Sequence, residues 1–299
     1  MRMGHILEND VLAVELADPE ECGGVRFDRT GFITQVRLKR SGHTFCTRER
    51  PEPGAGTGGA GICGEFGLFT PVGYDGAAVG EPFPKLGVGL LTRLDASGYD
   101  FRVSYPADYF AIRTEFGAQC AWYAVEPKEC GGYAAKLEKS VRIEGASLII
   151  EYELRNVGAR PIETEEYAHN FLAIDGHGPG PAYRLTFAAP LRLDAMEPVY
   201  TPRVADVAER ELRLRCELER DIYCAFDIPP GAEAGWELVH EPTGAGVRER
   251  CAPGAVRLAV WGAPHVLSPE LFVAVRVMPG ERMAWRRVFE FFRVGERDG

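Results

Sequence analysis

Residues 136–155 read KLEKSVRIEGASLIIEYELR. Apolar side chains recur at every second position on both sides of a short segment at residues 144–147, namely Leu137, Val141, Ile143, Leu148, Ile150, Tyr152 and Leu154. A period of two is typical of a strand that buries one face. The segment between the two runs has the composition of a turn. The stretch therefore predicts an antiparallel β-hairpin.

The rest of the chain continues as short apolar runs separated by turn residues. The 35 glycines and 21 prolines interrupt these runs at intervals that leave little room for long helices. Further strands are predicted at residues 11–16, 162–174, 256–261, 271–277 and 283–292. The sequence therefore predicts an all-β fold.

Three other segments carry separate predictions. Residues 25–28 and 32–38 flank an Arg-Thr-Gly turn, which predicts a second hairpin. Residues 203–220 have high helix propensity, but alternate apolar positions from Leu212 to Leu218 favour a strand in the second half. The Gly-rich segment 51–61 has almost no side chain able to pack. We expect a long surface loop next to a site there, in preference to a linker between domains.

Size and charge limit the class of protein. A chain of 299 residues is long enough for one large core, and we expect a single domain over residues 1–299. The formal charge of −10 would repel nucleic acids and anionic membrane surfaces. No segment has the length and apolar character of a signal peptide or a spanning helix. We expect a soluble, cytoplasmic protein without nucleic-acid or membrane partners.

The cysteines give no sign of a metal site or a disulfide framework. They are scattered and include no Cys-x-x-Cys pair, at positions 22, 46, 63, 120, 130, 216, 224 and 251. We expect reduced and mostly buried thiols. A redox or metal role is the alternative.

A family resemblance enters at the centre of the chain. Residues 139–158, followed by Ala168-His169-Asn170-Phe171, resemble the centre of aldose 1-epimerases, the galactose mutarotase family. Residues 268–272 and the turn at 278–281 are similar to that family's last strands. The resemblance covers about residues 22–292. It implies a large antiparallel β-supersandwich with a cleft for a small-molecule sugar on its concave face. We expect a monomer or homodimer.

The sequence also departs from that family. Ala168 precedes His169 where the family has an asparagine, and the nearest counterpart of an earlier His-Gly-Gly segment is residues 84–89, which contain Lys85. Three classes of function therefore stay open: an epimerase-like enzyme, a non-catalytic carbohydrate-binding module, and a different sugar-processing enzyme on the same fold.

Interconversion of sugar anomers requires a base for the C1 hydroxyl proton and an acid for the ring oxygen. A carboxylate paired with an imidazole suits both tasks, without metal or organic cofactor. The resemblance implies that His169 is the general acid; a structural histidine in a β-core is the alternative. Glu270 is the candidate base, because it follows Pro269 at the entrance of a strand, where cleft residues often lie.

Candidate sugar-binding residues precede and flank this pair. Glu65, Tyr74 and Lys85 combine a carboxylate, a phenol and an ammonium beside the Gly-rich loop, and such groups bind hydroxyls and C–H surfaces. A surface ion pair between Glu65 and Lys85 is the alternative; a Lys85 that faces the cleft would favour an anionic sugar. Tyr167 shares a strand face with His169. His265 is either a second sugar-binding imidazole or an exposed loop residue.

Overall fold

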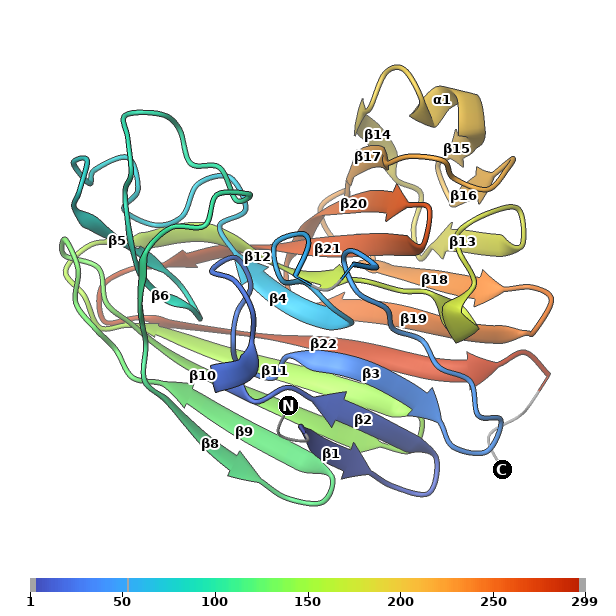
Figure 1. Cartoon of the computed structure of the whole chain (residues 1–299), viewed down its shortest axis with the longest axis horizontal. Coiled ribbons are helices and arrows are strands. Elements are labelled where there is room, and N and C mark those ends of the chain that lie inside the picture. Colours follow the sequence, from blue (N-terminus) through green and yellow to red (C-terminus); the bar gives the residue numbers. More distant parts are fainter. Residues whose placement is uncertain (1–3, 53, 296–299) are drawn as a thin grey trace.

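The computed structural model describes residues 4–52 and 54–295, and nearly all of its regular structure is antiparallel β-sheet (Figure 1). Within these residues the strands form two large sheets and one small sheet. The first large sheet contains, in spatial order, β1 (His5–Glu8), β2 (Leu12–Leu16), β3 (Ile33–Leu38), β4 (Ile62–Phe66), β12 (Ile162–Asn170), β21 (Val266–Val277), β20 (Ala255–Ala263), β17 (Ile222–Asp227) and β14 (Arg192–Met196). We call it the front sheet.

The second large sheet packs against the front sheet, and we call it the back sheet. It contains β15 (Ala205–Ala208), β16 (Glu211–Leu214), β13 (Tyr183–Phe187), β18 (Gly235–His240), β19 (Ala245–Ala252), β22 (Arg282–Arg293), β11 (Ser147–Asn156), β10 (Ala135–Glu144), β9 (Cys120–Val125) and β8 (Ile112–Phe116). The small sheet contains β5 (Pro82–Lys85), β6 (Gly89–Thr92) and β7 (Ala107–Tyr109). The helical elements are short: η1 (Pro19–Glu21), η2 (Ile174–Gly176) and α1 (Thr201–Val204).

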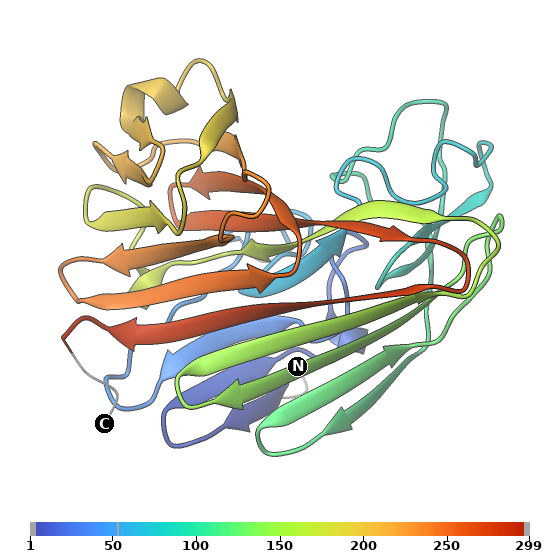
Figure 2. The same ribbon diagram turned by 180° about the vertical axis from the view of Figure 1, so that it is seen from behind.

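The hairpin predicted at residues 136–155 is confirmed. β10 and β11 pair antiparallel from Ala135 opposite Asn156 to Glu144 opposite Ser147. β9 and β22 extend the pair on either side, and these long strands run next to one another in Figure 2. Most of the remaining predicted strands also form, because alternation and turn residues are local signals that the final packing did not override.

The hairpin predicted from residues 25–28 and 32–38 is wrong. Residues 25–28 form no strand, and β3 pairs instead with β2 and β4. The Asp28 carboxylate accepts hydrogen bonds from the backbone N–H and the hydroxyl of Thr30 and from the ammonium of Lys139. These local bonds and the buried ion pair fix an irregular turn where the sequence suggested a ladder.

Residues 203–220 are divided between elements. The helix α1 ends at Val204, and strands β15 and β16 follow, so the strand predicted for the second half forms only as far as Leu214. Outside residue 53, which lies beyond the described residues, the segment 51–61 contains turns and bends and no strand. The glycines thus produce the loop that the composition predicted.

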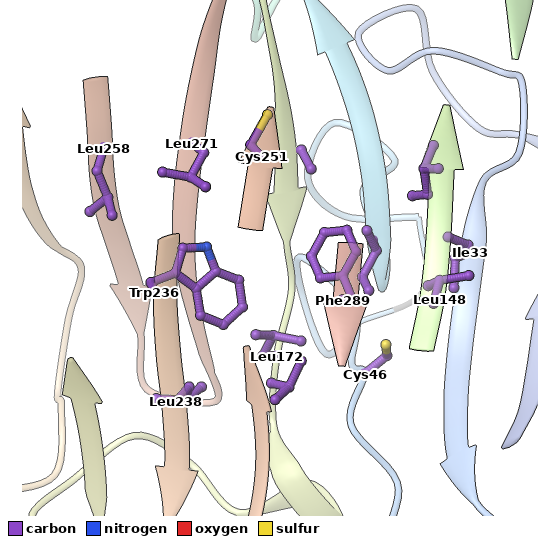
Figure 3. Packing of buried hydrophobic residues seen from close by; sticks show 14 of the residues in the cluster. Ile33, Cys46, Leu148, Leu172, Trp236, Leu238, Cys251, Leu258, Leu271 and Phe289 are labelled. Atoms are coloured by element: carbon purple, nitrogen blue, oxygen red, sulfur yellow. The ribbon is translucent and has the colours of Figure 1, made fainter. Parts of the chain in front are cut away.

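The hydrophobic core lies between the two large sheets. Figure 3 shows buried side chains of both sheets meeting there, such as Leu258 and Leu271 from the front sheet and Trp236 and Phe289 from the back sheet. Alternate residues on each strand supply these contacts, because successive side chains point to opposite faces. The packing therefore fixes which residues of the front sheet point away from the core.

A buried charge network crosses this core beneath β12. Arg287 is fully buried and donates to Glu166 and to Glu249, each at 2.7 Å. The indole N–H of Trp285 donates to Glu166 at 2.9 Å, and that of Trp236 donates to Glu249 at 2.7 Å. We call these five residues the inner network. They tie the middle of the front sheet to the back sheet.

The eight cysteines are free thiols, five of them buried. Within residues 4–52 and 54–295, no helix is long and apolar enough to cross a membrane.

Candidate functional site

His169 and Glu270 meet on the face of the front sheet that points away from the core. They lie on the neighbouring strands β12 and β21. Nδ1 of His169 is 3.3 Å from Oε1 of Glu270, and the side chains are only 7 % and 5 % exposed. The Ser268 hydroxyl lies 2.9 Å from Nδ1 and donates to Oε1 at 2.9 Å. An imidazole, a hydroxyl and a carboxyl group thus form one hydrogen-bonded unit.

His169 and Glu270 each have one further polar side-chain atom. Nε2 of His169 and Oε2 of Glu270 make no hydrogen bond to any residue that the structure describes. Neither atom is among the fully buried side-chain atoms that lack a hydrogen-bond partner in the described part of the chain. Both are therefore available to a bound molecule.

Aromatic rings surround the imidazole of His169. Phe171 stacks on it with centroids 4.0 Å apart, Trp261 meets it edge-on at 5.4 Å, and Phe27 does so at 5.9 Å. Trp261 is partly exposed. These rings hold the imidazole in one orientation and provide apolar surface of the kind that meets sugar C–H groups.

Burial shifts both titratable groups toward their uncharged forms. Burial lowers the pKa of His169 well below its usual value, and the nearby charge of Arg26 lowers it further. Burial raises the pKa of Glu270 to about 8, although the hydrogen bond from Ser268 acts in the opposite direction. At pH 7 the pair therefore holds one proton. Perturbed pairs of this kind are typical of acid–base sites.

A second buried polar group adjoins the pair. The Arg26 guanidinium donates to Glu65 at 2.8 Å and to the hydroxyl of Tyr167 at 2.9 Å, and Tyr167 donates to Glu65. The Lys85 ammonium donates to Glu65 at 3.0 Å. Tyr167 precedes His169 by two positions on β12, and their rings lie 5.9 Å apart. The two polar groups therefore share one face of the sheet.

The electrostatics of this second group centre on Glu65. Burial alone would raise the pKa of Glu65, but Lys85 and Arg26 reverse the effect and hold it below its usual value. Burial lowers the pKa of Lys85, and Glu65 opposes that change. Glu65 and Lys85 are both fully buried, so their contact is not the surface ion pair considered as the alternative. Two cations therefore surround the Glu65 carboxylate, and Glu165, which also acts on Lys85, is paired with Arg257.

The Gly-rich loop reaches the site through Thr57. Its hydroxyl accepts a hydrogen bond from Arg26 at 3.2 Å, and its backbone N–H donates to Glu49. A Cβ added at Gly59 would lie 2.4 Å from the ring of Phe171, so the loop backbone passes directly against the ring that stacks on His169. A side chain at position 59 would displace one or the other.

Two of the candidates from the sequence lie away from this unit. Tyr74 is buried in a cluster with side chains of the small sheet, where it contacts Phe83 and donates to the backbone carbonyl of Ser97. His265 lies in the turn between β20 and β21, where its Nε2 is 3.1 Å from the carbonyls of both Arg48 and Glu49. Tyr74 therefore packs in a hydrophobic cluster, and His265 contacts the backbone just before the Gly-rich loop.

Sequence reasoning missed Arg26 and Ser268. Arg26 lies in the segment wrongly assigned to a hairpin, and no spacing signal links it to Glu65. Ser268 lies in the stretch that carries the resemblance, and its place two residues before Glu270 on one strand face could have identified it.

Some other features lie outside the unit. No group of three or more His, Cys, Asp or Glu side chains in the described ranges is arranged to hold a metal ion. A cavity of about 1030 Å³ is lined by the β10–β11 turn and the end of β22, and none of the site residues lines it.

The comparisons with known proteins bear on the fold. No family model matches the sequence, and no curated protein matches it. A galactose mutarotase related enzyme from Lactobacillus acidophilus has a similar structure, with a TM-score of 0.66, 11 % identity and coverage of 99 % of this chain and 100 % of that one.

Two further solved structures agree. A galactose mutarotase-like protein from Clostridium acetobutylicum has a TM-score of 0.61 at 9 % identity, over 97 % of this chain and 95 % of that one. An aldose epimerase homologue from C. elegans has a TM-score of 0.55 at 12 % identity, over 97 % and 98 %. These likenesses extend over almost the whole length of each chain. The chain therefore has the fold of galactose mutarotase-like proteins.

Proposed function

We propose that the chain is an aldose 1-epimerase-like isomerase, which interconverts the anomers of a small-molecule sugar by acid–base ring opening and closure. The observation that carries this proposal is the buried contact between His169 and Glu270, with Nε2 and Oε2 free of hydrogen-bond partners among the described residues. An imidazole and a carboxyl group that share one proton can supply both the acid and the base that the reaction requires.

In the proposed reaction Glu270 takes the proton of the C1 hydroxyl while His169 donates a proton to the ring oxygen. The ring opens, the C1–C2 bond rotates, and the reverse transfers close the ring on the other face. Arg26, the least buried member of the second polar group, is proposed to orient the sugar, with Glu65, Lys85 and Tyr167 as the buried residues that hold it in place. The aromatic rings around His169 would contact its C–H surface.

The nature of the sugar follows from the charges beside the pair. Arg26 and Lys85 pair with Glu65, and Arg257 pairs with Glu165, the other carboxylate that acts on Lys85, which leaves one excess positive charge although the Lys85 ammonium itself is buried. We therefore propose that sugars with an acidic or phosphate substituent are included among the substrates. A panel of neutral and anionic aldoses tests this part.

The direct test is to follow freshly dissolved pure anomers by polarimetry or NMR. We expect the protein to speed the approach to equilibrium of at least one aldose, and His169→Gln and Glu270→Gln each to reduce this rate about 10²-fold or more. Glu163→Gln, an exposed residue on β12 paired with Arg276, is the matched control and should keep the full rate. Unchanged rates in both site variants would refute the catalytic assignment.

A non-catalytic sugar-binding protein is the second candidate. The 3.3 Å contact engages His169 and Glu270 with each other, which a binding protein would tolerate. In that case calorimetry would detect sugar binding that survives Glu270→Gln, without any acceleration of anomer exchange. Absence of binding to every sugar in the panel would exclude both candidates.

A further inference from the structure

Ser268 occupies a corner of a small triangle of polar atoms. Its Oγ is 2.9 Å from Nδ1 of His169 and 2.9 Å from Oε1 of Glu270, and the third side of the triangle measures 3.3 Å. The same Oγ accepts the backbone N–H of Asn170 at 2.9 Å. Ser268 is fully buried. Its hydroxyl therefore has no solvent partner and three protein partners.

A hydroxyl group has one hydrogen to donate. The Asn170 N–H is always a donor, so the hydrogen of Ser268 goes either to Oε1 or to Nδ1. If it goes to Oε1, Nδ1 must carry a hydrogen of its own to bond Oγ. If it goes to Nδ1, the carboxyl group must carry the hydrogen that bonds Oγ. In the first arrangement the proton lies on Nδ1 of His169, and in the second it lies on the carboxyl group of Glu270.

The distances favour the path through the hydroxyl. Hydrogen bonds in proteins cover about 2.7–3.2 Å between nitrogen and oxygen and about 2.5–3.0 Å between two oxygens. The two sides of 2.9 Å that involve Ser268 fall in these ranges, whereas the direct side of 3.3 Å between Nδ1 and Oε1 lies outside its range. Oγ is therefore the better-placed bridge between the two titratable groups.

We propose that Ser268 is a positioning residue that transfers the proton of the pair between Glu270 and His169. In the forward step the Oε1–H bond breaks as an Oγ–H bond forms, and the original Oγ–H bond breaks as an Nδ1–H bond forms. The hydroxyl ends unchanged, Glu270 becomes a carboxylate, and His169 becomes an imidazolium. No proton enters or leaves the site.

This transfer converts the uncharged pair into the form that the proposed reaction needs. With Glu270 protonated and His169 neutral, the carboxyl group has no base function, and loss of the Nε2 proton would leave an imidazolate. After transfer, His169 can donate from Nε2 and Glu270 can accept at Oε2. The other charged groups that act on Glu270 are Arg26, Glu65 and Arg257. The catalytic use of this proton rests on the proposed function. The proton link between Glu270 and His169 through Ser268 does not.

The proton link is tested without any sugar, by ¹⁵N NMR of histidine-labelled protein between pH 5 and 10. His169→Gln identifies the His169 signals. We expect the neutral ring to carry its hydrogen on Nε2 while Glu270 is protonated, and on Nδ1 once Glu270 ionises. Glu270→Gln should hold one tautomer throughout. In Ser268→Ala the tautomer should no longer follow the titration, and Ser268→Thr, which keeps the hydroxyl, should restore it.

The outcomes separate this inference from the proposed function. A pH-dependent change of tautomer that is the same in wild type and Ser268→Ala would overturn the role of Ser268, as would a folded Ser268→Thr protein that behaves like Ser268→Ala. If the wild-type protein has no epimerase activity, the proposed function fails while the spectra still decide the proton link. If it is active, we expect Ser268→Ala to lower kcat about tenfold or more with KM unchanged.

Discussion

Glu270 is a carboxyl group whose surroundings disfavour its charge. It is buried among the strands of the front sheet, and its hydrogen-bond partner is a neutral hydroxyl. The folded state therefore retains the proton of Glu270 to about pH 8, whereas the ordinary value is 4.5. This difference makes the stability of the protein depend on pH in a way that can be measured.

We predict that Glu270→Gln removes a loss of stability at alkaline pH. Between about pH 4.5 and 8 the folded protein binds this proton and the unfolded chain does not, so the stabilisation present below pH 4.5 is lost as pH rises to 8. The glutamine side chain of the variant is neutral at every pH. Its unfolding free energy should rise relative to wild type by several kcal/mol from pH 5 to pH 9.

Urea unfolding at pH 5, 7 and 9 measures this difference. The titration of His169 in the unfolded chain is the same in both proteins, so it cancels in the comparison. Glu163→Gln, whose carboxylate is exposed, provides the control and should give a curve parallel to that of wild type. A parallel curve for Glu270→Gln as well would contradict the raised pKa.

At the scale of single residues, the sequence allowed prediction of side chains on regular strands. Tyr167 and His169 share a face because they lie two positions apart on β12, and the pairing of β12 with β21 brings Glu270 beside them. Arg26 could not be predicted, since the irregular turn at Asp28 and Thr30 that carries it depends on Lys139 from another strand. Tyr74 was assigned by proximity along the chain, but its ring packs in a separate cluster.

At the scale of elements, β12 has polar residues on both faces. Tyr167 and His169 point outward to the site, and Glu166 and Asn170 point inward, where Glu166 bonds Arg287 and Asn170 donates to the backbone carbonyl of Pro269. The inner network therefore supports, from the core side, the two strands that carry His169 and Glu270. Removing its cation would leave two carboxylates buried together.

We predict that Arg287→Met destabilises the protein by about 3–5 kcal/mol, because an unpaired buried charge is far more costly than an intact pair. Arg276→Met on β21 is the matched control. Its ion pair with Glu163 is exposed on both sides, so its loss should change stability by about 0.5 kcal/mol or less. Chemical denaturation of both variants at pH 7 measures the contrast. Equal effects would show that the inner network contributes no more than a surface pair.

Elements defined by local signals were predictable, and those defined by distant partners were not. The β10–β11 hairpin has its turn, its alternation and its register within residues 135–156. The supposed hairpin at residues 25–38 had similar local signals, but β3 found its partners in β2 and β4. The short helix α1 and strands β15 and β16 likewise divide a segment whose helix propensity alone favoured a longer helix.

At the scale of the whole molecule, the sequence and its family resemblance predicted a large antiparallel sandwich, and the structure confirms that fold class. The order of strands in the front sheet could not be predicted from the sequence. β12 lies between β4 and β21, each about one hundred residues away along the chain, and no local pattern specifies such pairings. The separate sheet β5–β7 was likewise not foreseen.

The distribution of thiols over the molecule gives a further prediction. Cys120 and Cys216 are exposed, whereas burial raises the pKa of Cys22, Cys46 and Cys224 to about 12. Because the thiolate is the reactive form, we expect two of the eight thiols to react rapidly with dithiobis-nitrobenzoate in the folded protein, and all eight in denaturant.

The double variant Cys120→Ser and Cys216→Ser should lose the rapid phase and keep six slow thiols. More than two rapid thiols in the wild-type protein would mean that the sandwich opens more readily than its burial implies. Fewer would point to a disulfide, which added reductant would reveal.

The two polar faces of β12 also limit how this protein can evolve. Insertion of one residue ahead of Glu166 would turn Tyr167 and His169 into the core and expose Glu166 and Asn170. Such a change would abolish the site and the inner network in a single step, so natural variation in length should be excluded from this strand. The loop at residues 51–61 has no such restriction along most of its length. New specificities in descendants of this chain should therefore arise from loops around an unchanged strand.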